Sequence, residues 1–413
     1  MKNVAAPIAP GGRLTLLDIL RGFAIFGILM VNMKIFINPL SIMMVKPEAG
    51  LSMLVLLPDL LVRFLFEGKF YTLFSLLFGY GFWIFMNKMV ESGSILPIFR
   101  RRLFVLLMFG VLHILLLWAG DILFFYALFG FILILFRKSS NRKITIWAII
   151  LILIPPIVVT FSWGILALGA SVPEGKAAID ASMAESFRTI NELIERAYHV
   201  YGNGSFTEIV KIRLAEWRML LPGLLFFYPA VLGVFLLGML AARKGLAELT
   251  AGSLSFFRHA LRWSFLVGVI CEGFYTYASL YADMMAPNGF SALASLSHAI
   301  GAPALTLFYV SLVITLYKKG FLCGLWNVLV PVGRMALTNY LMQSIICTTI
   351  FYSYGFGYFG KLSTSEGIIL VFLIFIFQIF FSRYWLSRFR FGPMEWLWRR
   401  LTYMTPQPMR KKG

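Results

Sequence analysis

The sequence predicts an all-α fold, a polytopic transmembrane helix bundle. Hydrophobic residues make up 60% of the 413 residues, and the mean hydropathy is +0.84, whereas an average soluble domain is roughly 45–50% apolar. Apolar runs of about 20 residues recur along the whole chain, and a helix needs about that length to cross the hydrocarbon core of a bilayer. The alternation of a membrane β-barrel is not visible. Since backbone polar groups in lipid must be satisfied within the segment, we expect helices throughout.

About ten spanning helices are expected, and one further apolar segment is not counted among them. Segment 51–66 is short and carries Pro58, Asp59 and Arg63, and it would invert every later loop if it crossed the membrane. We expect it to be re-entrant or interfacial. The predicted spans are residues 17–37, 70–89, 102–119, 121–136, 144–170, 218–241, 263–281, 293–316, 325–349 and 367–385.

The distribution of Lys and Arg predicts that the N-terminus and the C-terminus are both cytoplasmic. In that orientation the inner stretches hold 24 of the 37 basic residues, the outer stretches hold 11, and Arg21 and Arg334 lie within helices. This is the positive-inside pattern of membrane proteins. It accounts for the net charge of +19, so we expect a lipid bilayer and no nucleic acid as partner.

The chain start and the cysteines add two expectations. Residues 1–33 lack a small-residue cleavage site and are interrupted by Asp18 and Arg21, so we expect a retained first helix and not a signal peptide. Cys271, Cys323 and Cys347 show no paired spacing. We therefore expect neither a disulfide framework nor a metal site.

The chain is expected to be a single membrane domain, residues 1–413, with two appended segments. Residues 171–217 form the one sizeable polar insertion, and we expect a helical cap on the outer face, with a break at Gly202–Gly204. Residues 386–413 alternate Trp and Arg with apolar residues. We expect a cytoplasmic amphipathic tail with these side chains at headgroup depth.

Ionisable residues on the first predicted span form one candidate group. Asp18, Arg21 and Asn32 lie at spacings of three and eleven residues, which puts them on one face of a helix. A buried charge in a membrane is costly, so that face is expected to point into the bundle. It is either part of a functional site or an ion pair that orders the cytoplasmic end of the helix.

His113 and Asp121 form a second candidate group, in the outer half of the bundle. A histidine within a membrane can carry a proton or act as a general base because its pKa lies near neutrality. The alternative is a neutral histidine bonded to a neighbouring helix. Glu67 and Lys69, at the outer start of span 70–89, form either an interfacial salt bridge of little worth or the mouth of a cavity near Asp121.

The late span 325–349 carries a third group. Arg334 lies near its cytoplasmic end, and Asn339 and Gln343 share a face one turn apart. These groups suggest a polar cavity, to which Glu272 and Tyr275 of span 263–281 would contribute. The alternative is a set of interhelical hydrogen bonds worth about 0.6 kcal/mol each.

The same stretches resemble the YeiB-like family of bacterial membrane proteins, long catalogued as a domain of unknown function. The matching motifs are Leu17–Ala24, Glu67–Phe70, Phe74–Gly79, His113 with Trp118–Asp121, Gly333–Tyr340 and Arg388–Arg399. They cover the chain from end to end. The resemblance implies a multi-pass protein of the bacterial cytoplasmic (inner) membrane.

That family in turn resembles transmembrane acyltransferases such as the heparan glucosaminide N-acetyltransferases, which share the Leu-Asp-x-x-Arg-Gly helix ending in Val31-Asn32. This implies transfer of an acyl group from cytoplasmic acyl-CoA to an acceptor on the far face. The acetyltransferases carry a catalytic histidine in the loop after the first helix, whereas residues 34–67 contain no histidine. Either His113 has taken that role or the chemistry is different.

The leading hypothesis is therefore an acyl-CoA-dependent membrane acyltransferase acting on a hydroxyl or amine of an envelope glycan or lipid. His113, oriented by Asp121 or Glu67, would be the base. No tightly bound cofactor is expected, acyl-CoA being the donor. The expected CoA-phosphate site comprises Asp18, Arg21, Lys318, Lys319 and Arg334, and the expected cavity lining comprises Asn32, Lys69, Asn339 and Gln343.

Two other classes remain open. A small-molecule transporter or permease would use the same buried polar residues as a substrate or proton pathway. A noncatalytic membrane scaffold or sensor would use the cap at 171–217.

Overall fold

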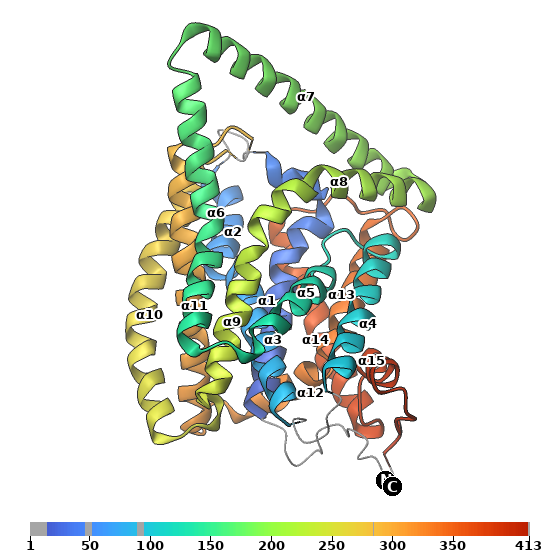
Figure 1. Cartoon of the computed structure of the whole chain (residues 1–413). Coiled ribbons are helices and arrows are strands. Elements are labelled where there is room, and N and C mark those ends of the chain that lie inside the picture. The colour runs from blue at the N-terminus through green and yellow to red at the C-terminus, as the bar shows by residue number, and fades with distance from the viewer. Residues whose placement is uncertain (1–14, 46–51, 89–94, 284, 412–413) are drawn as a thin grey trace.

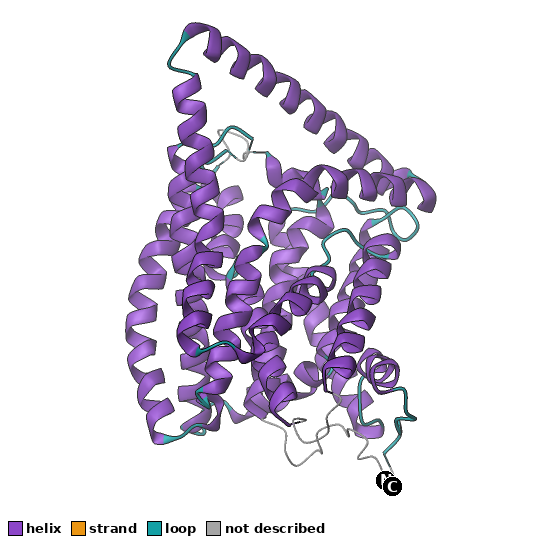
Figure 2. Ribbon diagram, viewed as in Figure 1, coloured by secondary structure: helices purple, strands orange, loops and turns teal. Residues whose placement is uncertain are grey.

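The structure, a computed structural model, describes residues 15–45, 52–88, 95–283 and 285–411 (Figure 1). All regular elements among these residues are helices (Figure 2), apart from an isolated bridge between Phe389 and Arg410. The α-helices are α1 (Thr15–Ile37), α2 (Met53–Leu65), α3 (Lys69–Lys88), α4 (Ile95–Leu116), α5 (Leu123–Leu133), α6 (Asn141–Gly169), α7 (Pro173–Asn203), α8 (Phe206–Phe227), α9 (Pro229–Arg243), α10 (Ala251–Ala278), α11 (Gly289–Lys318), α12 (Cys323–Arg334), α13 (Ala336–Phe351), α14 (Thr364–Arg388) and α15 (Pro393–Tyr403). The short 3₁₀ helices are η2 (Leu40–Met44), η4 (Ile134–Lys138) and η5 (Leu246–Glu248).

Several of these helices have the length and composition of membrane spans. Among the described residues α1, α6, α10, α11 and α14 are long and apolar enough to cross a bilayer, and the bent pair α8–α9 raises the count from five to six. These elements coincide with six of the ten predicted spans. The apolar helices indicate a membrane protein.

The other four predicted spans fall on helices that do not reach this standard. Helix α5 has 11 residues, and α12 and α13 have 12 and 16, whereas a crossing needs about 20. Helix α4 carries Arg100, Arg101 and Arg102 near its start, and α3 carries several glycine, serine and tyrosine residues. For these segments the sequence prediction of separate spans goes beyond what length and hydropathy support.

Helix α1 lies at the centre of the bundle and packs against α3, α12, α13 and α14 (Figure 1). Its contact with α12 is unusually close, because a Cβ added at Gly22 would lie 2.3 Å from the Leu329 carbonyl oxygen, and one at Gly333 would lie 1.8 Å from that of Asp18. A larger residue at either position would force the two backbones apart. Helices α10 and α11 form an antiparallel pair beside α6.

Three helix interruptions occur within the bundle. Segment 51–66, predicted to be re-entrant or interfacial, contains α2, in which no residue is buried; residue 51 lies outside the described part. Helix α2 ends just before Gly68, whose φ of +84° favours glycine, and α3 begins at Lys69. Helices α8 and α9 meet at 44°, and α12 and α13 are separated at Met335.

The predicted cap at 171–217 consists of α7 and the first half of α8, joined at Gly204–Ser205 (Figure 1). Ser205 and Glu208 form a capping box at the start of α8, which fixes that helix start. Tyr201, Ile209 and Ile212 belong to a buried apolar cluster with the C-terminal end of α1. The segment is thus packed onto the bundle along its second half.

The described start of α1 and the tail helix α15 lie at the same end of the molecule (Figure 1). The residues before Thr15, predicted to be cytoplasmic, lie outside the described part. Helix α15 packs against α4 and α13. Trp398 donates its indole N–H to the Arg102 carbonyl oxygen at 2.9 Å, and its ring lies 3.7 Å below the Arg102 guanidinium.

Candidate functional site

His113 and Asp121 lie together, with a serine that sequence reasoning did not single out. His113 is in the last turn of α4, Asp121 lies just before α5, and Ser344 is on α13. The distance from His113 Nδ1 to Asp121 Oδ2 is 2.9 Å, and that from His113 Nε2 to Ser344 Oγ is 2.8 Å. The three residues are 1–3% exposed, so the group is shielded from solvent. We call these three residues the histidine site.

Neighbouring groups hold the histidine site in place. Asp121 Oδ1 accepts a hydrogen bond of 2.7 Å from the Phe124 amide, so the carboxylate lies at the N-terminus of α5, where negative charge is stabilised. The Tyr340 hydroxyl lies 3.3 Å from both the Gly120 carbonyl oxygen and the Ile122 amide. It thereby ties the loop that carries Asp121 to the helix that carries Ser344.

The contact between His113 and Asp121 is close without being an aligned hydrogen bond. Neither His113 Nδ1 nor Asp121 Oδ2 has a partner with hydrogen-bond geometry, although they are 2.9 Å apart. Catalytic hydrogen bonds are often poorly aligned before substrate binds.

The first half of α8 covers this site. Arg213 is fully buried and donates from one terminal nitrogen to the carbonyl oxygens of Ile114 and Leu115, at 3.2 and 2.8 Å. Trp217 donates its indole N–H to the Ala119 carbonyl oxygen at 2.7 Å. The unpaired carbonyls at the end of α4, adjacent to His113, are thus satisfied by the cap.

Glu67 and Lys69 lie in a different cluster. Lys69 forms a fully buried ion pair with Glu272 and also donates to the Arg63 carbonyl oxygen at 2.8 Å. His298 Nδ1 lies 3.3 Å from the other oxygen of Glu272. We call Glu67, Lys69, Glu272, Tyr275 and His298 the lysine cluster. Of the two alternatives for Glu67 and Lys69, the salt bridge between them is not formed, because Lys69 pairs with Glu272 and Glu67 accepts from Tyr275.

Glu67 accepts a hydrogen bond of 2.9 Å from the Tyr275 hydroxyl and is not a partner of His113. The lysine cluster lies level with the middle of α1, because Phe66 and Phe70 pack on Phe26 and Phe23. From there a line of charges continues towards the end of α1. In that line Asp59 lies 2.8 Å from both Lys34 and Arg63.

The residues expected to hold the donor lie at the other end of α1. Asp18 and Arg21 form an ion pair at 2.9 Å, which was the structural alternative for them, and Arg334 donates to the Arg390 carbonyl oxygen at 3.4 Å. Arg102 lies within electrostatic range of both Arg399 and Arg21. We call Arg21, Arg102 and Arg399 the arginine cluster. Arg102 and Arg399 were not singled out from the sequence.

The remaining predicted residues lie apart from both sites. Lys318 and Lys319 are exposed at the end of α11, and Asn32 is half-buried on α1. Asn339 donates to Ser382 Oγ at 3.0 Å, and Gln343 donates to Gln378 at 2.9 Å. Asn339 and Gln343 therefore form hydrogen bonds between α13 and α14. This was the alternative to a polar cavity. Glu272 and Tyr275 do not join that network.

Glu395 of the tail helix is a further residue that sequence reasoning missed. Its carboxylate accepts from the Leu337 and Thr338 amides at 2.7 and 3.0 Å and from the Thr338 hydroxyl at 2.6 Å. It thus satisfies the first amides of α13, the helix that carries Ser344. Burial raises the pKa of Glu395, while these hydrogen bonds lower it by a smaller amount.

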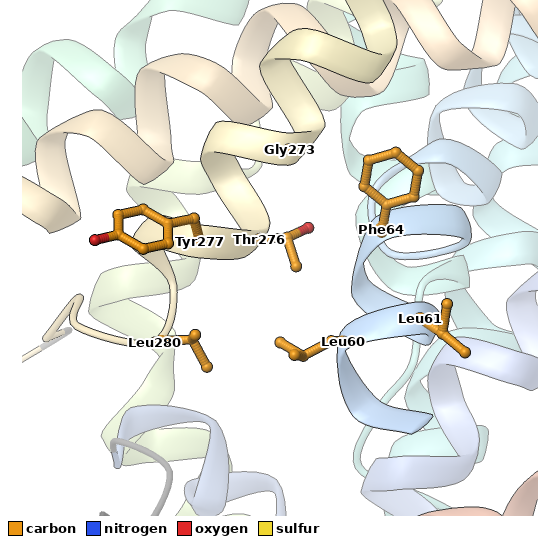
Figure 3. Close-up of a pocket in the computed structure, with 7 residues that line it drawn as sticks. All are labelled: Leu60, Leu61, Phe64, Gly273, Thr276, Tyr277 and Leu280. Atoms are coloured by element: carbon orange, nitrogen blue, oxygen red, sulfur yellow. The ribbon is translucent and has the colours of Figure 1, made fainter. Parts of the chain in front are cut away.

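Neither the histidine site nor the lysine cluster lines the apolar groove between α2 and α10 (Figure 3). This groove has a volume of about 340 Å³ and is lined by Leu60, Leu61, Phe64, Gly273, Thr276, Tyr277 and Leu280. Its walls are suited to a hydrocarbon chain and offer no pair of polar groups for catalysis. Within the described ranges no group of three or more His, Cys, Asp or Glu side chains is placed to hold a metal ion.

Comparison with known proteins gives full-length relatives. A family profile described as "Protein of unknown function (DUF418)" matches residues 241–405, which include Glu272 and Ser344 but not His113. The chain is 34% identical to the uncharacterized protein YxaH of Bacillus subtilis (strain 168), over 98% of each chain. It is 30% identical to the uncharacterized protein YeiB of Escherichia coli (strain K12), over 95% of this chain and 97% of the other. No solved structure matches.

Proposed function

For this chain, which belongs to the YeiB-like family of DUF418 proteins, we propose the function of a membrane acyltransferase with His113 as its general base. The single observation that carries the proposal is the buried contact between His113 and Asp121, at 2.9 Å. A carboxylate beside one imidazole nitrogen orients the ring and leaves the other nitrogen to take a proton. His113 Nε2 is then the nitrogen that would deprotonate a hydroxyl or amine.

The proposal includes a topology of ten crossings in the bacterial inner membrane. Besides the six apolar elements, α2–α3, α4, α5 and α12–α13 would cross as interrupted or shorter segments, where neighbouring helices cover the backbone. The excess of Lys and Arg in alternate loops assigns the end with α15 to the cytoplasm. His113 is then in the outer half and the arginine cluster is at the inner end.

The arginine cluster is the proposed site for the phosphates of an acyl-CoA donor. Guanidinium groups bind phosphate through paired hydrogen bonds, and a phosphate near several of them gains from the attraction of each. Arg334, Lys318 and Lys319 are at the same end and would add to the attraction. The acceptor would approach from the outer face, as a hydroxyl or amine of an envelope glycan or lipid.

Acetyl-CoA is the probe that tests both halves of this function. Detergent-solubilised protein is expected to bind it and to release CoA slowly in the absence of acceptor. The Arg21→Gln variant should bind more weakly, whereas Lys244→Gln, which changes an exposed lysine of the same end, should bind normally. The His113→Ala variant should bind acetyl-CoA but release no CoA, with His259→Ala as control for an exposed histidine. A folded protein that does not bind millimolar acetyl-CoA would refute the donor assignment.

A second candidate function is transport, and the lysine cluster favours it. A buried lysine, two glutamates and a histidine at a helix interruption resemble the sites at which transporters bind ions or substrates. If this reading is correct, His113→Ala protein in liposomes should retain solute or proton flux while Lys69→Met abolishes it. The opposite pattern, with loss at His113 in an acyl-transfer assay, favours the enzyme.

A further inference from the structure

Ser344 lies next to the proposed base, in the position that a substrate hydroxyl or amine would otherwise occupy. Its Oγ lies 2.8 Å from His113 Nε2, and His113 Nδ1 faces Asp121. The hydroxyl nearest to the basic nitrogen therefore belongs to the protein itself. We propose that Ser344 is a catalytic nucleophile, which carries the acyl group as an ester between donor and acceptor. This inference rests on the proposed acyl transfer and specifies its route.

The order of the three groups supports this role. A nucleophilic hydroxyl, an imidazole and a carboxylate, each in contact with the next, form the arrangement that activates serine in many unrelated folds. Here the three residues come from α13, the end of α4 and the start of α5, so each is held by a separate element. The Tyr340 contacts with Gly120 and Ile122 keep α13 in register with the loop that carries Asp121.

The burial of Ser344 fits a covalent intermediate. An acyl ester at a solvent-exposed serine would be open to hydrolysis, whereas a site 1–3% exposed excludes the competing water. An ester also allows donor and acceptor to use the site at different times. That order suits a donor held at one end of the bundle and an acceptor arriving from the other. The first half of α8, which Arg213 hydrogen-bonds to the end of α4, is the element that would move to admit the acceptor.

The chemistry balances in two steps. In the first, Ser344 Oγ attacks the thioester carbonyl carbon, His113 Nε2 takes the hydroxyl proton, the carbon–sulfur bond breaks, and the leaving thiolate takes the proton back from His113. In the second, the acceptor hydroxyl or amine gives its proton to His113 and attacks the ester carbonyl. The bond from the acyl carbon to Ser344 Oγ then breaks, and Ser344 Oγ takes the proton.

Trapping the ester is the direct experiment. Folded protein incubated with acetyl-CoA alone and quenched in acid should carry an acetyl group on the peptide that contains Ser344. The Ser344→Ala variant should lack this adduct and lose transfer activity by roughly 10³-fold or more. Ser344→Cys should retain a trapped adduct as a thioester. Thr348→Val, which removes a buried hydroxyl one turn further along α13, should behave as the unchanged protein does.

A fluorophosphonate probe separates failure of this inference from failure of the proposed function. The probe should label Ser344, and the label should be lost in Ser344→Ala and His113→Ala proteins. Labelling without any reaction with acetyl-CoA would keep Ser344 as a nucleophile and refute the donor. CoA release and transfer at full rate by Ser344→Ala would keep the acyltransferase and overturn the nucleophile. Absence of any adduct in both experiments, with melting temperatures showing folded protein, would also overturn it.

Discussion

The histidine site and the Lys69–Glu272 pair of the lysine cluster are both buried, and each has a histidine beside its carboxylate, yet the two differ in charge compensation. In the lysine cluster the carboxylate of Glu272 is already neutralised by the ammonium of Lys69, and His298 lies at the margin of the pair. In the histidine site no Lys or Arg of the described residues pairs with Asp121, and the imidazole contacts a neutral hydroxyl. A charge-compensated pair resists a change of protonation, whereas a histidine between a carboxylate and a hydroxyl can gain and lose a proton. We therefore expect catalysis at the histidine site and a contribution to stability from the lysine cluster.

The largest expected effect comes from exchanging the two histidines separately for glutamine. His113→Gln should lower acyl transfer by roughly 10³–10⁴-fold, because the base is lost. His298→Gln should change the rate by less than about tenfold, because His298 lies at the margin of the Lys69–Glu272 ion pair and that pair is kept. Initial rates at saturating acetyl-CoA measure both. Equal losses in the two variants would mean that the sites act as one, contrary to the comparison.

The next effect is on stability and concerns the lysine cluster. Lys69→Met leaves Glu272 buried without a counter-charge and should lower the free energy of unfolding by about 3–5 kcal/mol. The double variant Lys69→Met/Glu272→Leu should recover most of that loss, because the uncompensated charge is removed. Thermal unfolding in detergent, followed by size-exclusion chromatography, measures both proteins. A double variant that is folded yet inactive would assign the pair to function as well.

A smaller effect is expected at Asp121. Asp121→Asn keeps the shape and the contact with the Phe124 amide but removes the negative charge, so transfer should fall by roughly 10²-fold. The melting temperature should change little by comparison with Lys69→Met. The rate and the melting temperature of the same preparation are the decisive measurements, since loss of the negative charge should lower the rate while the protein stays folded. A purely structural Asp121 would lower stability and leave the rate of the folded protein unchanged.

The smallest effect concerns Glu395, outside both sites. Burial holds the pKa of Glu395 above its ordinary value, so the folded state binds this proton more tightly than the unfolded state does. Its contribution to stability is therefore complete below the ordinary pKa and is lost as the pH rises through the raised value. Glu395→Gln protein should show a flatter dependence of melting temperature on pH between about 4 and 8. An unchanged slope would contradict the assignment.

Sequence reasoning identified the parts of the site that are close together along the chain. His113 and Asp121 flank one helix end, so their proximity follows from local structure. Ser344 is 231 residues away from His113, and Glu272 is 203 away from Lys69. Such pairings depend on how helices pack, and hydropathy carries no information about them. Glu67 and Lys69 are the opposite case, because they are close in the sequence and yet do not contact each other. A glycine with positive φ lies between them, and their side chains have different partners.

The same limit applies to the fold. The class and the positions of the long apolar helices follow from composition, because lipid demands continuous hydrogen-bonded segments. The interruptions at Gly68 and Met335 do not, because each is stabilised by tertiary contacts that supply the missing backbone partners. Glu395 at the start of α13 is such a contact, and a tail expected only to lie at headgroup depth proves to complete a core helix.

The position of Glu395 also sets an order of assembly. During synthesis the start of α13 leaves the ribosome before Glu395 does, and its first amides have no carboxylate to donate to until the last helix has been made. The contact that fixes the start of the helix carrying Ser344 is therefore among the last to form. A protein truncated before Pro393 would contain every residue of the histidine site. It would still lack Glu395, which fixes the start of the helix that carries Ser344.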